Sequence, residues 1–377
     1  MEKEQIIKYR RYFHQHPELG YNTQKTCQFI KNVLDNLGYE THLLLNDAAV
    51  IARLNLNKAK TIAFRSDMDA LPIIENTDLE FKSINGCMHA CGHDAHMAVL
   101  LGAAHLFMEN KSVLNSNIVL IFQPAEEGPL PGGALPIIEN YDFSNIDYFF
   151  AYHVTNKLHT GQIGIKPKEA CAAPDLWECS IKGKGCHAST PHLGFSPILP
   201  AAKIISEFEK LHQELKKHNT VISTTYVNGG VSMNIIPDEI KLKGTARSFS
   251  KAERDNLKTQ MQKIIDTECN NYHVTNEFDF HYAYDPVYND EEAVKLVINA
   301  TNNVLKPENV IILENPEMVG EDFSYYRRTG AKTCLTWLGV RGNNQEFFDL
   351  HNSKFLLDEE ALLPASKILL NIAKANL

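Results

Sequence analysis

The stretch Ile118-Val119-Leu120-Ile121-Phe122-Gln123-Pro124-Ala125-Glu126-Glu127-Gly128 decides the fold of this chain. Its first five residues form a continuous apolar run, which is typical of a strand buried on both faces of a largely parallel sheet. Two adjacent carboxylates, Glu126 and Glu127, follow at the end of the strand, where open α/β sheets bind ligands. Solvated loops also often contain Glu-Glu, so partners from other strands must decide whether the pair marks a site.

Other apolar runs extend this pattern on both sides. We expect strands at 50–54, 61–64 and 148–151, a helix at 95–110, and an earlier helix between Thr23, its predicted N-cap, and Gly38. Apolar strands that alternate with helices are typical of a largely parallel sheet covered on both faces. The sequence therefore predicts an α/β fold with three layers.

The pattern changes near Pro174 and returns after Pro286. Between them we expect strand 176–181, helix 198–215, strands 221–226 and 239–247, helix 252–272 and strand 276–284. That βαββαβ order is the split ferredoxin-like unit. A helix at 291–304, strands at 310–313 and 333–339, and a terminal helix from 358 follow. We therefore expect a discontinuous larger domain, 1–174 and 286–377, with an inserted α+β domain at 175–285.

Composition limits the classes of partner. The net charge of −9 over 377 residues, without a Lys/Arg-dense face, argues against nucleic acid or an anionic membrane as partner. No apolar run approaches the ~18 residues of a membrane-spanning helix, and the charged first residues do not resemble a secretory signal. Eight scattered cysteines predict reduced thiols rather than a disulfide scaffold. We expect a cytoplasmic protein.

The segment Cys87-Met88-His89-Ala90-Cys91-Gly92-His93-Asp94-Ala95-His96 holds the densest group of potential metal ligands, just before a predicted helix. Three other interpretations are open for it alone: a helix-capping turn, a structural zinc site, or a Cys91 nucleophile activated at a helix N-terminus. A structural zinc site usually needs four closed ligands, and no second cluster of paired ligands follows.

Three predicted strands bring further polar residues to the same edge of the sheet. The strand at 61–64 leads to Asp69, the central strand leads to Glu126 and Glu127, and the strand at 148–151 leads to His153. Because these strand ends meet beside Cys91 and His93, the sequence predicts a metal centre. Thiolate and imidazole suit zinc, nickel or cobalt better than magnesium or calcium, and mixed ligation leaves manganese open.

The chain resembles the co-catalytic metallopeptidase family of aminoacylase and carboxypeptidase G. Within it, the chain is most similar to the amidohydrolase branch of hippurate hydrolases, auxin-conjugate hydrolases and N-acetyldiaminopimelate deacetylases. The matching segments span the chain in order: 10–18 (RRYFHQHPE), 65–72 (RSDMDALP), 88–96 (MHACGHDAH), 123–128 (QPAEEG), 183–188 (GKGCHA), 320–326 (GEDFSYY) and 350–352 (LHN).

The resemblance implies two divalent metal ions per subunit. Cys91 would bridge them, with His93 and His153 on one ion and Glu127 and His351 on the other. Spacing alone does not single out His351, for which a surface histidine is the default. His14 and His16 match the opening motif, but we expect only a structural role for them, and His89 and His96 are left out of the ligand set.

The resemblance and the chemistry of an amide together suggest a mechanism. Two ions roughly 3.5–4 Å apart can activate a hydroxide and polarise the scissile carbonyl, and Glu126 would act as general base. Asp69 would orient His93 through its other ring nitrogen; without the resemblance it reads as a turn residue.

In the inserted domain, the resemblance implies that His187 donates to the oxyanion, often in a partner subunit's site. Arg247 and Asn234 would hold the substrate's carboxylate. The alternatives are a loop histidine that caps a strand end and a solvated arginine at a strand edge. The inserted domain would thus act as a lid and as the dimerisation surface of a homodimer.

The expected activity is hydrolysis of an N-acyl amino acid, of the acetyl or benzoyl type, to a carboxylate and a free amino acid. N-acetyldiaminopimelate deacetylation is one specific form of it. A dipeptidase, aminopeptidase or carboxypeptidase of the same family, acting on short peptides, is the second hypothesis. A binding protein without catalysis is the third, and the presence of Glu126 beside every expected ligand argues against it.

Overall fold

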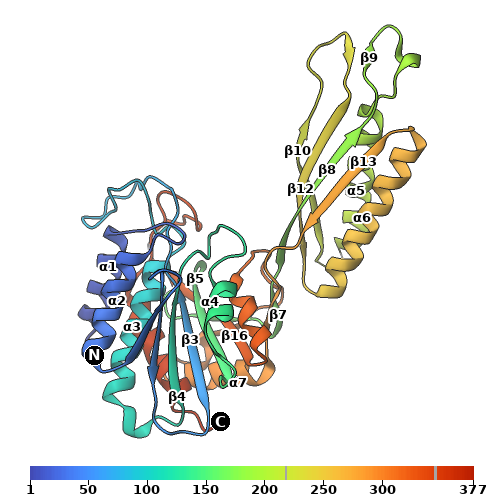
Figure 1. The fold of residues 1–377 in the computed structure, drawn as a ribbon. Coiled ribbons are helices and arrows are strands. Elements are labelled where there is room, and N and C mark those ends of the chain that lie inside the picture. Colours follow the sequence, from blue (N-terminus) through green and yellow to red (C-terminus); the bar gives the residue numbers. More distant parts are fainter. Residues whose placement is uncertain (217–218, 344–345) are drawn as a thin grey trace. The chain divides into compact units, whose positions relative to one another are not determined.

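The computed structural model describes residues 1–216, 219–343 and 346–377 (Figure 1). The chain folds into two compact units. The larger unit comprises Met1–Ala170, Tyr288–Pro316 and Asp322–Leu377, and the smaller unit comprises Cys171–Val287 and Glu317–Glu321. The sequence placed the boundaries at 174/175 and 285/286 and assigned 317–321 to the larger domain, so it did not identify this short return into the smaller unit.

The larger unit is built on a sheet of eight strands in the order β1-β2-β4-β3-β5-β16-β6-β15. The strands are β1 (Glu40–Leu44), β2 (Ala49–Leu54), β3 (Thr61–Asp67), β4 (Asn117–Gln123), β5 (Tyr148–His159), β6 (Ile163–Ile165), β15 (Val310–Ile312) and β16 (Lys332–Arg341). The pairs β4–β3, β3–β5, β5–β16 and β6–β15 are parallel. The predicted largely parallel sheet is confirmed.

Helices cover both faces of this sheet. They are α1 (Lys3–Gln15), α2 (Gln24–Leu37), α3 (His93–Glu109), α4 (Ala134–Asn140), α7 (Glu291–Asn302) and α8 (Leu362–Ala373). Apolar residues of α1, α2, α3, α7 and α8 share one core with Phe64, Leu120 and Phe150 of the sheet. On the other face, Phe149 stacks on Tyr326 of the 3-10 helix Asp322–Thr329, which packs against α4. Three layers result, as predicted.

Local sequence explains where these helices lie. Helix α3 is buried along nearly its whole length, which its Ala- and Leu-rich sequence permits. Helix α2 ends at Gly38, whose φ of 88° suits a residue without a Cβ. Thr23 occupies the predicted N-cap position, but its hydroxyl donates to the carbonyl of Ala48 at 2.8 Å and does not cap the helix. The hydroxyl therefore joins α2 to the start of β2.

The smaller unit has the predicted βαββαβ order. Its elements are β8 (Ala173–Lys182), α5 (Ile198–Leu215), β10 (Val221–Asn228), β12 (Glu239–Ser248), α6 (Lys251–Asn271) and β13 (Thr275–His281). The antiparallel sheet has the order β10-β12-β8-β13, and α5 and α6 pack together against it around Trp177 and Phe208. The ferredoxin-like prediction is confirmed.

Short elements complete the structure. They are β7 (Lys168–Cys171), β9 (Cys186–His187), β11 (Ile235–Ile236), β14 (Val287–Asn289) and the 3-10 helices Lys111–Val113, Pro191–Leu193, Pro307–Asn309 and Glu359–Ala361. Strands β9 and β11 form a two-stranded ribbon. Among the described residues, no helix is both long and apolar enough to cross a membrane.

Candidate metal centre

Four elements of the larger unit bring the predicted residues to one edge of the sheet. Strand β3 ends at Asp67 and leads to Asp69, β4 leads to Glu126 and Glu127, and α3 begins at His93. His153 was expected just after a strand, but β5 continues to His159. Strand β3 pairs with β5 only as far as Ala151, so His153 lies two residues past the last paired position, beside Cys91 and His93.

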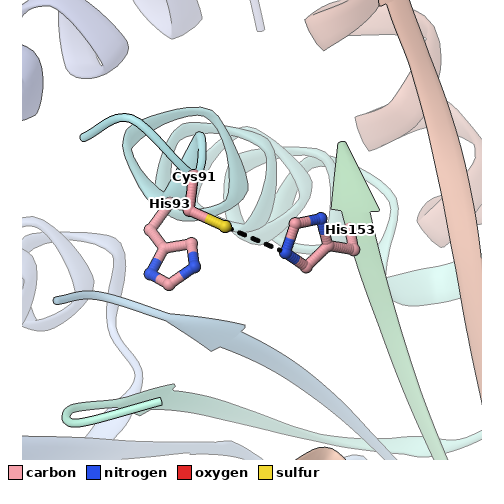
Figure 2. A group of neighbouring side chains, drawn as sticks. All are labelled: Cys91, His93 and His153. Atoms are coloured by element: carbon pink, nitrogen blue, oxygen red, sulfur yellow. Dashed lines mark hydrogen bonds between the residues drawn. The ribbon is translucent and has the colours of Figure 1, made fainter. Parts of the chain in front are cut away.

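The first group of donor atoms is formed by Cys91, His93 and His153 (Figure 2). One donor atom from each side chain lies within 4.8 Å of the others, and all three residues are buried. The Cys91 sulfur is 3.4 Å from Nε2 of His153, whose Nδ1 bonds to the carbonyl oxygen of Val154 at 2.8 Å. Because Nδ1 must donate to that carbonyl, Nε2 keeps a lone pair directed at the group.

The second group contains Cys91, Glu127 and His351. Nε2 of His351 is 3.3 Å from the Cys91 sulfur and 3.0 Å from Oε1 of Glu127. The backbone of His351 has a φ of 63°, and its N–H donates to the carbonyl of Ala90 at 2.9 Å. That bond ties the strained residue to the neighbour of Cys91. The structure thus brings together all five side chains that the resemblance implies as ligands, with Cys91 common to both groups.

Asp69 organises the two glutamates rather than making a hydrogen bond to His93. Its Oδ1 accepts the backbone N–H of Glu126 at 2.9 Å, and its Oδ2 accepts that of Glu127 at 3.0 Å. Oδ1 lies 3.6 Å from Nδ1 of His93, longer than a hydrogen bond. Glu126 is buried, and its Oε2 is 3.9 Å from Nε2 of His93. The general base that was expected therefore borders the first donor group.

The electrostatics of the site call for a cation. Burial, followed by the carboxylates of Glu127 and Glu126, raises the pKa of the Cys91 thiol well above its usual value. Burial opposes protonation of His93, but Asp67 and Asp69 outweigh it and raise the pKa of His93 to about 10. Neither ring nitrogen of His93 has a hydrogen-bond partner among the described residues. A divalent ion would satisfy this buried imidazole and turn the thiol into a thiolate ligand.

The thiol's surroundings also bear on the nucleophile interpretation. An activated cysteine needs an electropositive environment that lowers its pKa. The carboxylates around Cys91 have the opposite effect, so this geometry does not favour a cysteine nucleophile.

Sequence and structure comparisons give the same family. Residues 63–375 match the model of the peptidase family M20/M25/M40. The chain belongs to this family. It is 35% identical to Thermostable carboxypeptidase 1 of Saccharolobus solfataricus, over 95% of this chain and 91% of that protein. It is 34% identical to N-acetyl-L-cysteine deacetylase of Bacillus subtilis, over 99% of this chain and 88% of that protein.

A solved structure agrees with both the family and the metal chemistry. The Bacillus subtilis YXEP protein, described as a dinuclear metal-binding peptidase of the M20 family, superposes with a TM-score of 0.86. The two chains are 31% identical, and the match covers 99% of this chain and 97% of that one. The M20 chain described here thus has the fold of a dinuclear relative and two groups of donors that share one thiol.

His96 lies close to His93, but hydrogen bonds occupy both of its ring nitrogens. Its Nε2 accepts the backbone N–H of Val154 at 2.9 Å, so that nitrogen carries no proton. Its Nδ1 therefore holds the proton and donates to Oδ1 of Asp67 at 2.5 Å. Although Asp67, His93 and His96 lie close enough to form a third group of donors, both nitrogens of His96 are used. The structure accordingly supports leaving His96 out of the ligand set.

Asp67 and Arg65 were not singled out from the sequence. Nη1 of Arg65 donates to Asp67 at 2.7 Å, and Nη2 donates to Asp322 at 2.8 Å; all three side chains are buried. These contacts join the 65–72 motif to the 320–326 motif. The signal was present in the two matched motifs, but only tertiary contacts show that they form one network.

The remaining predicted residues lie in the smaller unit. His187 on β9 is exposed, and its Nδ1 accepts the backbone N–H of Ser189 at 3.1 Å, which leaves Nε2 as the protonated nitrogen of the neutral ring. Asn234 adjoins it, since the Asn234 carbonyl accepts the N–H of Ala188 at 2.9 Å. Arg247 on β12 donates to the carbonyls of Ala246 and Met318 at 3.0 and 3.1 Å.

Proposed function

We propose that this M20-family hydrolase is a metal-dependent amidohydrolase that cleaves N-acyl amino acids, of the acetyl or benzoyl type, to a carboxylate and a free amino acid. The observation that carries the proposal is the Cys91 thiol, which is shared by two groups of donor atoms beside the buried carboxylate of Glu126. One oxygen of Glu126 also lies within 4.8 Å of donor atoms of His93 and Glu127, where a carboxylate could carry the proton of a metal-assisted hydrolysis.

Two divalent ions would occupy this centre, one held by Cys91, His93 and His153 and the other by Cys91, Glu127 and His351. The thiolate and imidazole ligands favour zinc, nickel or cobalt, and the Glu127 carboxylate leaves manganese possible. When bound, such ions activate a water molecule and polarise the amide carbonyl.

The protein's own residues would carry the proton. Glu126 accepts a proton from the attacking water and delivers it to the leaving nitrogen as the C–N bond breaks, so the products are a carboxylate and an amine. Asp69 holds the backbone of Glu126 and Glu127 and so fixes their different directions. The neutral tautomer of His187, with its proton on Nε2, is suited to donate to the oxyanion.

Recognition of the amino acid's carboxylate is assigned to Arg247 and Asn234 of the smaller unit. Part of the Arg247 guanidinium bonds to backbone carbonyls, which would hold its remaining donors in one orientation for a carboxylate. We include these residues, together with His187, in a lid made by the smaller unit.

The substrate class has two further candidates. N-acetyldiaminopimelate would be one specific N-acetylated substrate of the same reaction. A metallo-dipeptidase or carboxypeptidase activity is the second, and the relative named a carboxypeptidase favours it, whereas the relative named a deacetylase favours N-acyl amino acids. Both require the same centre.

We further propose a homodimer through the smaller unit, in a reducing compartment such as the cytoplasm. Strand β10 is an edge strand of its sheet and carries the exposed Tyr226 and Val227, and Met233 in the segment that follows it is fully exposed. Exposed apolar edge strands favour pairing with another chain. All eight cysteines are free thiols, as a reducing compartment maintains.

A substrate panel tests the function. Metal-free protein, prepared with a chelator and reloaded separately with zinc, cobalt, nickel or manganese, would be given N-acetyl and N-benzoyl amino acids, N-acetyldiaminopimelate and dipeptides with free amines. We expect release of amine from the N-acyl compounds, loss of activity on chelation and recovery on reloading. Turnover of the dipeptides alone would favour the peptidase, and turnover without metal would refute the proposed centre.

A further inference from the structure

His14 is a buried histidine of α1 that lies between two buried carboxylates. Its Nδ1 is 2.8 Å from Oδ2 of Asp94, and its Nε2 is 3.0 Å from Oε1 of Glu75. The side chains of all three residues are at most 1% exposed. The motif that contains His14 was expected to be only structural, yet both ring nitrogens are committed to carboxylates from other parts of the chain.

The first contact leads to the Cys91–His93 segment. Asp94 follows His93 in the first turn of α3. Arg10, one turn before His14 on α1, also donates its Nε to Oδ2 of Asp94 at 2.8 Å. The Asp94 carboxylate therefore has two partners on α1, His14 and Arg10, and would keep Arg10 if His14 were removed.

The second contact leads to the segment of His351. Glu75 lies in residues 72–86, which we call the Glu75 loop. The backbone N–H of Asn76 in this loop donates to the carbonyl of Ser353 at 2.8 Å, two residues after His351. His14 thus connects α1 to the start of α3 through Asp94, and to the His351 segment through the Glu75 loop.

The charge balance explains why a histidine is suited to this position. Burial and the nearby Arg10 disfavour protonation of His14, but hydrogen bonds to Asp94 and Glu75 raise its pKa. Glu75 also accepts from the hydroxyl of Thr77 and the N–H of Ser83, both within its own loop. Without His14, the buried Glu75 carboxylate would keep only the Thr77 hydroxyl and the Ser83 N–H among these partners, and a buried charge that loses a partner is costly.

We propose that His14 is a positioning residue that holds the Glu75 loop, and through it the His351 segment, at the spacing from Cys91 that the second metal position needs. The inference rests on the proposed metal centre. It assigns His14 an effect on the position formed by Cys91, Glu127 and His351, while the position formed by Cys91, His93 and His153 keeps the Arg10–Asp94 contact.

Metal binding by His14→Ala and by the milder His14→Gln tests this assignment. Metal-free proteins would be dialysed against a series of free cobalt concentrations, and bound metal would be counted by mass spectrometry. We expect two ions per wild-type chain. In the variants we expect one tightly held ion and a second bound about 10- to 100-fold more weakly, the usual loss when an outer partner of a ligand is removed.

Tyr9→Phe is the matched control. Tyr9 lies on α1 and its hydroxyl is 2.9 Å from Nε2 of His105 on α3, so the variant removes a contact between the same two helices away from the ligands. It should leave both affinities unchanged. Hydrogen exchange of the metal-free proteins gives a second readout, in which the Asn76 amide should exchange faster in the His14 variants and not in Tyr9→Phe.

The outcomes separate the inference from the function on which it rests. Fewer than two ions on the wild-type chain would overturn the metal centre itself. Two ions with unchanged affinity in the His14 variants, or an equal loss in Tyr9→Phe, would overturn the role of His14 alone. If both His14 variants fail to fold, Glu75→Gln, which keeps the side-chain volume but removes the charge, decides by the same criteria.

Discussion

At the scale of single residues, Glu126 and Glu127 are adjacent but have different surroundings. Ala125 before them has a φ of 58°, an unusual conformation for alanine. The two N–H groups that follow are both held by Asp69. The Glu127 carboxylate meets His351, while Glu126 stays beside His93 without joining the Cys91–His351 group. Strain in the backbone thus lies directly before two neighbouring carboxylates to which we assign different roles.

Glu126→Gln should separate the two roles. The amide keeps the size of the side chain but cannot accept a proton, so we expect turnover of an N-acyl amino acid to fall by about 10²- to 10⁴-fold. Bound metal should remain at the wild-type stoichiometry, measured by mass spectrometry of the same sample. Glu127→Gln is the control and should lose metal as well as activity. Wild-type turnover in Glu126→Gln would show that another group carries the proton.

From the sequence alone, we could select side chains that belong to a local motif. Contacts between residues far apart in sequence, and hydrogen bonds to the backbone, could not be predicted in this way. The carboxylate pair at a strand end and Cys91-Gly92-His93 before a helix could be found from pattern. His351 required the resemblance, because it lies 260 residues from Cys91 in sequence. Asp69 was placed near the right residues, but its hydrogen bonds go to backbone N–H groups, which no side-chain pattern encodes.

At the scale of elements, the start of α3 depends on Gly92. This residue lies between Cys91 and His93, has a φ of 81°, and leaves no room for a side chain: an added Cβ would be 2.3 Å from Cγ2 of Val154. Val154 follows His153 on β5, so the glycine allows the helix and the strand to approach at the donor group. Helix α3 and strand β5 can meet here only because Gly92 adopts a positive φ and has no side chain to contact Val154.

Gly92→Ala should therefore destabilise the protein and weaken metal binding together. The left-handed conformation alone costs about 1–2 kcal/mol for a residue with a Cβ, and the clash with Val154 adds about 1–3 kcal/mol. Gly161→Ala is the control, since Gly161 has a φ of 86° but nothing within 4 Å of its Cβ. Urea unfolding should give a larger loss for Gly92→Ala, and equal losses would contradict the role of the close approach.

The elements that the sequence located best were those with long periodic or continuous apolar patterns, such as α3, β4 and α5. The end of β5 was missed because Asn156 and Lys157 are residue types that are depleted in strands. The strand continues because β16 pairs in parallel with β5 from Tyr148 to Thr155 and, after a register shift, again at His159. Pairing with a strand that is distant in sequence, such as that of Thr155 with Gly339, therefore overrides the local preference.

At the scale of the whole molecule, the fold divides the proposed work between two units. The larger unit holds Glu126 and the five proposed ligands, which are Cys91, His93, Glu127, His153 and His351, and the smaller unit holds His187, Asn234 and Arg247. Sequence predicted this division because the βαββαβ order is local and periodic. It did not predict the return of 317–321 to the smaller unit, where the Glu317 carbonyl accepts the N–H of Ala172 at 3.0 Å, because a five-residue contact has no periodicity.

The proposed homodimer predicts that Glu126 and His187 of one active site come from different subunits. If His187 acts in the site of the partner subunit, a His187→Ala chain and a Glu126→Gln chain should complement each other. Each variant alone would be nearly inactive, but one site of the mixed dimer would combine an intact Glu126 with an intact His187. We expect activity to appear when the two proteins are mixed under conditions that allow subunit exchange.

The edge of β10 provides the structural control for this experiment. Val227→Glu places a charge on the exposed apolar edge and should convert dimers to monomers, measured by light scattering after gel filtration, because burying an unpaired charge in an interface is unfavourable. Leu176→Glu introduces the same charge at an exposed position of β8, an inner strand of the same sheet, and should remain dimeric. Complementation should be lost in the Val227→Glu background. A fully active monomer would instead place His187 in the site of its own chain. The His187 tautomer would be the same in both cases, because Ser189 of the same subunit sets it.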